Sequence, residues 1–132
     1  MAAVLLIEDV AVVRTTLMKF LERGGHAVTV CEGSHEAWRL LNQQRFDAVV
    51  TDIWMKDGDG LDLIGRIRAR GDTTPIVVIT GGDPRSPQST SVDAAIRAGA
   101  NQALMKPVTK TLLLDTVTAC LQSPGKENDG QA

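Results

Sequence analysis

Five short apolar runs, separated by segments with helical periodicity, constrain the fold of this sequence more than any other feature. Each run has the length of a strand, and four of them stop at a polar residue that can do chemistry. Alternation of strand and helix predicts a parallel sheet with right-handed crossovers and helices on both of its faces. The strands are predicted at residues 4–7, 27–31, 48–51, 76–80 and 103–105.

The helices between these strands are predicted from apolar residues that recur on one stripe, at residues 10–23, 34–43, 61–70, 92–98 and 109–121. Ser34 and Thr109 are the side chains expected to cap the second and the fifth helix. Glycine residues directly after the first and the fourth helix end them. Dense Gly and Asp content predicts a turn at residues 56–60, and Gly, Pro, Ser and Thr residues predict a long loop at 81–91.

The length and composition indicate one globular domain. A chain of 132 residues is long enough for a single core, with 1–122 as the domain and the polar residues 123–132 as a disordered tail. The net charge of −2 gives no sign of nucleic-acid binding. No apolar run approaches the ~18 residues of a membrane span, so a cytoplasmic protein without membrane contact is expected, with Cys31 and Cys120 reduced.

Polar residues at the ends of the predicted strands form a candidate site. Because the carboxyl ends of parallel strands share one edge of a sheet, Glu8, Asp9, Asp52, Thr80 and Lys106 are expected to lie together. Three carboxylates in one cleft repel each other, and a hard divalent cation such as Mg²⁺ relieves that repulsion. With a mobile cation in Lys106 and a small hydroxyl in Thr80, the set suits phosphoryl transfer, with Asp52 as the nucleophile that forms an acyl phosphate.

These residues resemble the receiver domain of bacterial two-component response regulators, and the resemblance extends over about residues 3–121. Each motif alone is weak, whereas their order and spacing together are specific. The matching motifs are the acidic pair Glu8-Asp9, the run Asp52-Ile53-x-Met55 followed by Asp59-Gly60-Leu61, the strand-ending Thr80, the turn Ala98-Gly99-Ala100 and Lys106-Pro107.

The resemblance implies a flavodoxin-like (βα)5 three-layer α/β/α sandwich with strand order 2-1-3-4-5, which is the order of the family's chemotaxis member. It also implies that Asp52 accepts a phosphoryl group from a phosphohistidine on a sensor histidine kinase or a histidine phosphotransfer protein. Such a domain catalyses only its own phosphorylation and dephosphorylation, and it signals by binding a downstream protein or by passing the phosphoryl group on in a phosphorelay.

The same resemblance assigns roles to the remaining site residues. Asp9 and Asp52 would bind Mg²⁺ directly together with the backbone carbonyl of Trp54, and Glu8 would act through a water molecule. Lys106 and Thr80 would bind the phosphoryl oxygens, Thr80 mainly in the activated state. The peptide bond between Lys106 and Pro107 would be cis, as is usual in the family.

Three features of the sequence depart from the family pattern. Ala103 replaces the aromatic residue that often stands three residues before the lysine. The segment from Thr80 to Lys106 spans 26 positions (106 − 80), about four more than usual. Lys56 stands where a proline often follows the methionine, and Trp54 occupies the second position after Asp52. We expect slow self-dephosphorylation, because Trp54 can shield an acyl phosphate and Gly82 has no side chain to steer a hydrolytic water. Partner contact is the other interpretation of Trp54.

Other functions remain open at this point. A phosphate-independent interaction module is favoured by Ala103 and opposed by the intact acidic set. The other alternative is a flavodoxin-like protein that binds nucleotide or flavin. It is opposed because this sequence has no phosphate loop at residues 9–13, where acidic side chains repel phosphate unless a metal is present. Because only eleven residues follow Leu121, a stand-alone receiver is expected, and a receiver that is part of a longer protein is the alternative. The last predicted helix has no evident charge pattern for a symmetric dimer, so the monomer is expected.

Overall fold

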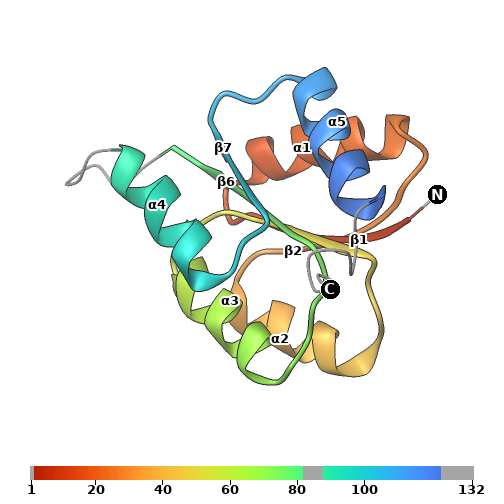
Figure 1. Cartoon of the computed structure of the whole chain (residues 1–132). Coiled ribbons are helices and arrows are strands. Elements are labelled where there is room, and N and C mark those ends of the chain that lie inside the picture. The colour runs from red at the N-terminus through yellow and green to blue at the C-terminus, as the bar shows by residue number, and fades with distance from the viewer. Residues whose placement is uncertain (1, 82–87, 123–132) are drawn as a thin grey trace.

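A five-stranded parallel sheet forms the centre of the fold (Figure 1), in a computed structural model that describes residues 2–81 and 88–122. Its strands are Ala3–Ile7 (β1), Ala27–Cys31 (β2), Ala48–Thr51 (β3), Ile76–Thr80 (β6) and Gln102–Met105 (β7). They lie in the order β2-β1-β3-β6-β7. Both the fold class and the strand order predicted from the sequence are confirmed.

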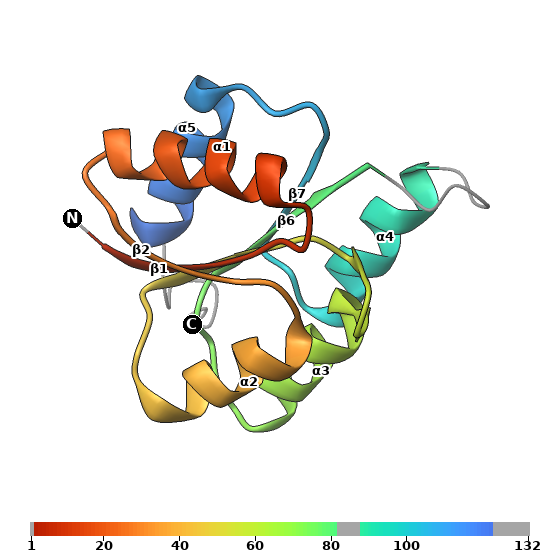
Figure 2. The same cartoon turned by 180° about the vertical axis from the view of Figure 1, so that it is seen from behind.

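Helices cover both faces of the sheet, as Figures 1 and 2 show from opposite sides. The helices α1 (Ala11–Arg23) and α5 (Lys110–Gln122) lie on one face, and α2 (Ser34–Gln43), α3 (Gly60–Ala69) and α4 (Gln88–Ala98) lie on the other. Within residues 2–81 and 88–122, no helix combines the length and the apolar character that crossing a bilayer requires.

Alternate side chains of each strand pack into two apolar cores, one on each face of the sheet. Leu5 and Ile7 of β1 pack with α2, α3 and α4, whereas Val4 and Leu6 pack with α1 and α5. The parallel register places Ile7 beside Thr51. The strands therefore end at nearly the same level, and the polar residues that follow them emerge along one edge.

Helix α4 begins at Gln88, four residues before the start predicted at 92. The prediction of a loop over 81–91 is therefore wrong for residues 88–91, while residues 82–87 lie outside the described part of the chain. The cause is the lack of apolar residues in the sequence Gln-Ser-Thr-Ser at this helix start, since hydrophobic periodicity detects only turns that carry apolar residues. The tail predicted at 123–132 also lies outside the described residues.

A short hairpin occupies the segment that was predicted as a turn. The strands Trp54–Met55 (β4) and Gly58–Asp59 (β5) pair antiparallel across the two residues between them. Gly58 has a φ of 133°, which a residue with a side chain rarely adopts. The two loop residues are Lys56 and Asp57, and the sequence signal for this element was the dense Gly and Asp content that predicted a turn at residues 56–60.

A residue of this hairpin caps helix α2, so the prediction that Ser34 caps it is wrong. The helix begins at Ser34, the residue before it is Gly33, and no side chain of that residue is available to cap it. Instead, the carboxylate of Asp57 accepts the backbone N–H groups of Ser34 and His35, each at 3.0 Å. In contrast, the predicted cap of α5 is confirmed, because Leu112 donates its N–H to Thr109 Oγ1 at 3.1 Å.

Replacing Asp57 by alanine is expected to lower the free energy of unfolding by about 1 kcal/mol, the usual value of a helix cap. The hydrogen bond from the His35 N–H holds the pKa of Asp57 below its ordinary value. The stabilisation is therefore present above about pH 4, the unfolded-state value, and is lost as the pH falls through the lower folded-state pKa.

Urea unfolding at neutral pH and at about pH 3 measures the contribution of the Asp57 cap to stability. The gap between wild type and Asp57→Ala should shrink at the lower pH. Glu22→Ala, on the exposed surface of α1, serves as the matched loss of a carboxylate and should change stability by less than about 0.5 kcal/mol. A gap that is equal at both pH values would contradict the capping role.

Candidate functional site

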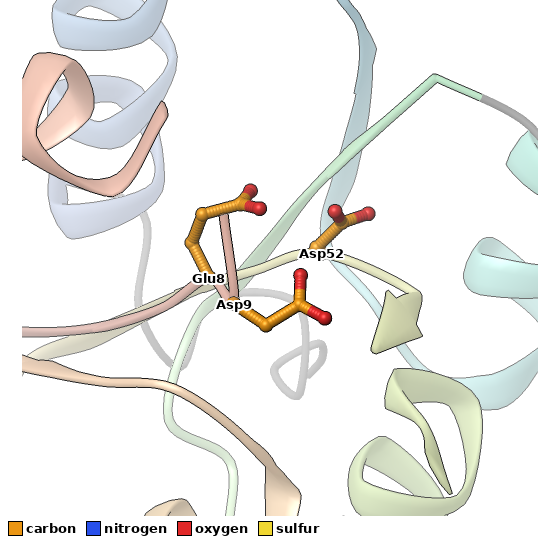
Figure 3. A group of neighbouring side chains, drawn as sticks. All are labelled: Glu8, Asp9 and Asp52. Atoms are coloured by element: carbon orange, nitrogen blue, oxygen red, sulfur yellow. The ribbon is translucent and has the colours of Figure 1, made fainter. Parts of the chain in front are cut away.

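Three carboxylates converge at the carboxyl edge of the sheet (Figure 3). Glu8 and Asp9 directly follow β1, and Asp52 directly follows β3, the neighbouring strand. One carboxylate oxygen from each residue lies within 4.8 Å of the other two. Sequence reasoning placed these three acids together, and the fold brings them together through the ends of two adjacent strands.

Lys106 lies between two of these acids. Its Nζ donates to Asp52 Oδ2 at 2.9 Å and to Glu8 Oε1 at 3.2 Å. The other oxygen of Asp52, Oδ1, accepts the N–H of Ile53 at 2.7 Å. Since the residue Asp52 is only 6% exposed, its carboxylate has a fixed orientation and little contact with bulk water.

The charges of this cluster influence one another. Burial raises the pKa of Glu8 above its ordinary value, and the neighbouring negative charge of Asp52 raises it further, although Lys106 opposes both effects. Burial on its own would lower the pKa of Lys106, but the hydrogen bond and the charge of Asp52, with a contribution from Glu8, raise it. The lysine is therefore held as a cation by the two acids that it touches.

Asp9 is attached to the hairpin that follows Asp52. Its Oδ2 accepts the backbone N–H of Lys56 at 3.1 Å. On the other side of the acidic pair, Arg14 of α1 donates to the carbonyl of Glu8 at 2.9 Å. Neither contact was predicted from the sequence. The Arg14 contact has no sequence signal, because it depends on the direction of a side chain on the first turns of a helix.

Thr80 is fully buried as the last residue of β6, and its carbonyl accepts the N–H of Lys106 at 3.0 Å. This bond aligns the lysine with the end of β6. Trp54 lies half-buried in β4 and packs against the apolar core on the α2–α4 face. Its indole Nε1 is buried and has no hydrogen-bond partner among the described residues. The metal-binding role of its carbonyl stays a prediction.

The donor set fits a hard divalent cation. All three side chains offer carboxylate oxygens, the ligands that Mg²⁺ prefers, and the cluster as a whole carries more negative than positive charge. Glu8 and Asp52 share the ammonium of Lys106, whereas Asp9 accepts a backbone N–H and forms no ion pair within residues 2–81 and 88–122. A cation bound at Asp9 and Asp52 would neutralise the charge that accumulates on phosphoryl oxygens.

Comparison with known families decides what this arrangement is. Residues 4–118 match the family described as the response regulator receiver domain. The chain belongs to this family. Receivers of this kind are signalling domains of two-component systems, for which phosphorylation and Mg²⁺ binding are typical. As the resemblance implied, the bond between Lys106 and Pro107 of this receiver is cis.

Individual relatives agree with this assignment. The response regulator MprA of Mycobacterium sp. (strain KMS) is 34% identical over 131 residues, which is 98% of this receiver and 55% of MprA. The transcriptional regulatory protein AfsQ1 of Streptomyces coelicolor is 32% identical over 132 residues, and the match covers 100% of the chain and 56% of AfsQ1. The receiver thus spans about half the length of these curated relatives.

Solved structures show the same fold. A two-component response regulator from Clostridium difficile has a TM-score of 0.83 at 27% identity, covering 92% of this chain and 97% of its own. The chemotaxis response regulator CheY4 of Vibrio cholerae has a TM-score of 0.79 at 26% identity, covering 90% and 98%. Both the strand order and the similarity to solved structures therefore support the CheY-like fold of the chain.

Proposed function

We propose that this receiver accepts a phosphoryl group onto Asp52 from a phosphohistidine of a partner protein, in a reaction that depends on Mg²⁺. The observation that carries the proposal is the carboxylate of Asp52 itself, which is buried, oriented by Ile53 and in contact with the cation of Lys106. Carboxylates are competent nucleophiles when they are oriented in this way.

In the proposed step, a carboxylate oxygen of Asp52 attacks the phosphorus atom, an O–P bond forms and the N–P bond of the donor phosphohistidine breaks. The electron pair of that bond returns to the imidazole, which takes up a proton from water. Lys106 moves from the carboxylate to a phosphoryl oxygen, and the hydroxyl of Thr80 donates to a second oxygen. Bound Mg²⁺ supplies the remaining charge neutralisation.

The surface beside the site suits a protein donor. A largely apolar hollow of about 470 Å³ lies between α1 and residues 106–108, and Lys106 lines it. Val12 on its rim is 72% exposed. We propose that the sensor histidine kinase or phosphotransfer protein packs against this hollow, because apolar exposure of this kind marks interaction sites.

Several finer expectations accompany the proposal. A cytoplasmic location, with Cys31 and Cys120 reduced, stays a prediction from the sequence. A boundary near residue 122, a monomer, an unidentified downstream protein target and a stand-alone arrangement stay predictions from the sequence. The printed name of AfsQ1 describes a transcriptional regulator, and a role in such a pathway is a proposal for this chain.

Intact mass spectrometry with Mg²⁺ and a small phosphodonor such as acetyl phosphate tests the proposal. Wild type should gain about 80 Da, the mass of one HPO₃ group, and Asp52→Asn should gain nothing. Asp62→Asn, a change of an exposed carboxylate on α3, should behave as wild type, and a chelator should abolish the gain. Failure of wild type with every donor and kinase would favour the phosphate-independent module that Ala103 suggests.

Replacing Trp54 by asparagine is expected to shorten the half-life of phospho-Asp52 several-fold, because the half-buried indole two residues away would no longer exclude water from the acyl phosphate. Loss of the 80 Da species after donor removal measures the half-life. Trp38→Phe, a change of the other tryptophan, should leave it unaltered. An unchanged half-life in Trp54→Asn would instead favour a role of this indole in partner contact.

A further inference from the structure

Helices α2 and α3 share an arginine surface, defined here as Trp38, Arg45, Arg66 and Arg70. Trp38 lies half-buried on α2, Arg45 follows the end of α2, Arg66 lies on α3 and Arg70 follows its end. The two helices run side by side under the same face of the sheet (Figures 1 and 2). This surface plays no part in the phosphoryl chemistry proposed above.

Two guanidinium groups stack on one indole. The Cζ of Arg66 lies 4.2 Å from the centroid of the Trp38 ring, and the Cζ of Arg70 lies 4.7 Å from it. Arg70 is also held by Asn42 Oδ1 at 2.7 Å and by Asp72 Oδ2 at 3.1 Å. Stacking and hydrogen bonding fix these long side chains before any ligand arrives, which reduces the entropy cost of binding.

Charge remains available on this surface. Arg70 is paired with Asp72, whereas Arg45 and Arg66 form no ion pair among residues 2–81 and 88–122. Both side chains are exposed. The receiver as a whole carries a net charge of −2, so two unpaired arginines beside a third form a local excess of positive charge on an acidic protein.

The surface is hollowed at one end. A cavity of about 220 Å³, lined by Arg45, Arg70, Phe46 and Thr74 with neighbouring residues, opens where α2 and α3 end. Asp72 also lines this cavity and pairs with Arg70, so Arg45 is the cation of the lining that has no acidic partner among the described residues. The guanidinium fork pairs with carboxylates in a bidentate geometry, and tryptophan and arginine are the residues most enriched in binding hot spots.

The arginine surface lies at the opposite edge of the sheet from Asp52. Arg45 precedes β3 and Arg70 precedes β6, whereas Asp52 follows the end of β3. A partner bound at the arginine surface would therefore leave the phospho-acceptor free for its donor. The two surfaces can be tested separately for the same reason.

We propose that the arginine surface binds an acidic segment of a partner protein, with Asp or Glu carboxylates on Arg45 and Arg66 beside Trp38. An acidic protein segment fits better than a nucleic acid, because the basic area is confined to three arginines and the rest of the chain is acidic overall. The proposal does not depend on phosphorylation of Asp52.

Nuclear magnetic resonance of the ¹⁵N-labelled chain tests the proposal, with a short poly-glutamate peptide as the probe at about 0.15 M salt. The expected shifts fall on the Trp38 indole N–H and on the backbone of α2 and α3. Reversing two charges with Arg45→Glu and Arg66→Glu together should weaken the affinity about tenfold, equivalent to about 1.4 kcal/mol.

Arg23→Glu with Arg97→Glu supplies the matched control, since both arginines are exposed on other helices and the net charge changes equally. This control should retain the affinity of wild type. Retained affinity in the Arg45 and Arg66 variant, or shifts located elsewhere, would overturn the proposal. Tighter binding of an oligothymidylate at the same surface would replace it with nucleic-acid binding. If the double reversal unfolds, Arg45→Gln with Arg66→Gln provides the same comparison.

Discussion

Lys106→Met is expected to lower the free energy of unfolding by about 3 kcal/mol in the absence of Mg²⁺ at neutral pH, because it leaves two buried carboxylates without their cation. Burial and Asp52 already raise the pKa of Glu8 above 4.5, and loss of the lysine removes an opposing influence. The defect should therefore be smaller below about pH 4.5, where Glu8 is protonated, and should grow as the pH rises through the folded-state pKa of Glu8.

Urea unfolding across this pH range, with and without Mg²⁺, measures the effect. Added Mg²⁺ should stabilise Lys106→Met more than wild type, since the cation and the lysine neutralise the same acids. Lys110→Met, a change of an exposed lysine at the start of α5, should shift stability by less than about 0.5 kcal/mol. A defect that does not vary with pH would argue against repulsion between the carboxylates as its cause.

Gly60→Ala is expected to destabilise the receiver by about 3 kcal/mol and to impair phosphorylation of Asp52. The added Cβ would overlap the backbone carbonyl oxygen of Asp52 and lie 3.3 Å from the Cα of Ile53. Backbone atoms cannot move aside as the end of a flexible side chain can, so the segment that carries Asp52 would itself shift. Both the urea midpoint and the yield of the 80 Da species should fall.

The same helix offers a matched control for this change. Gly65 lies on the exposed side of α3, and a Cβ built there meets no atom within 4 Å. Gly65→Ala should stabilise the protein by about 0.5–1 kcal/mol, because alanine is the better helix former. If both glycine variants behaved alike, helix propensity and not the contact with Asp52 would explain the result at Gly60.

Residues that lie in regular elements and carry apolar periodicity could be predicted well. The five strands and the edge that unites Glu8, Asp52 and Lys106 follow from strand length and from the geometry of parallel sheets. The start of α4 could not be predicted in this way, because its first four residues, Gln-Ser-Thr-Ser, are polar and give no apolar periodicity.

Contacts between distant segments were also beyond the sequence. The cap of α2 comes from Asp57, which is 23 residues away from Ser34, so a rule that examines only neighbouring residues selects Ser34 instead. Likewise, the bond from Arg14 to the carbonyl of Glu8 depends on the helix orientation that the completed core imposes. Local rules describe elements, whereas these contacts arise only after the elements pack together.

The hairpin of β4 and β5 is attached to the rest of the protein on two sides. Lys56 donates its backbone N–H to Asp9, and the next residue, Asp57, holds the start of α2. Consecutive residues thus connect one strand end to one helix start, and a register error of a single position would break both bonds. For engineering, the length of the segment from Asp52 to Gly60 must therefore be preserved, and reporter insertions or affinity tags belong elsewhere in the chain.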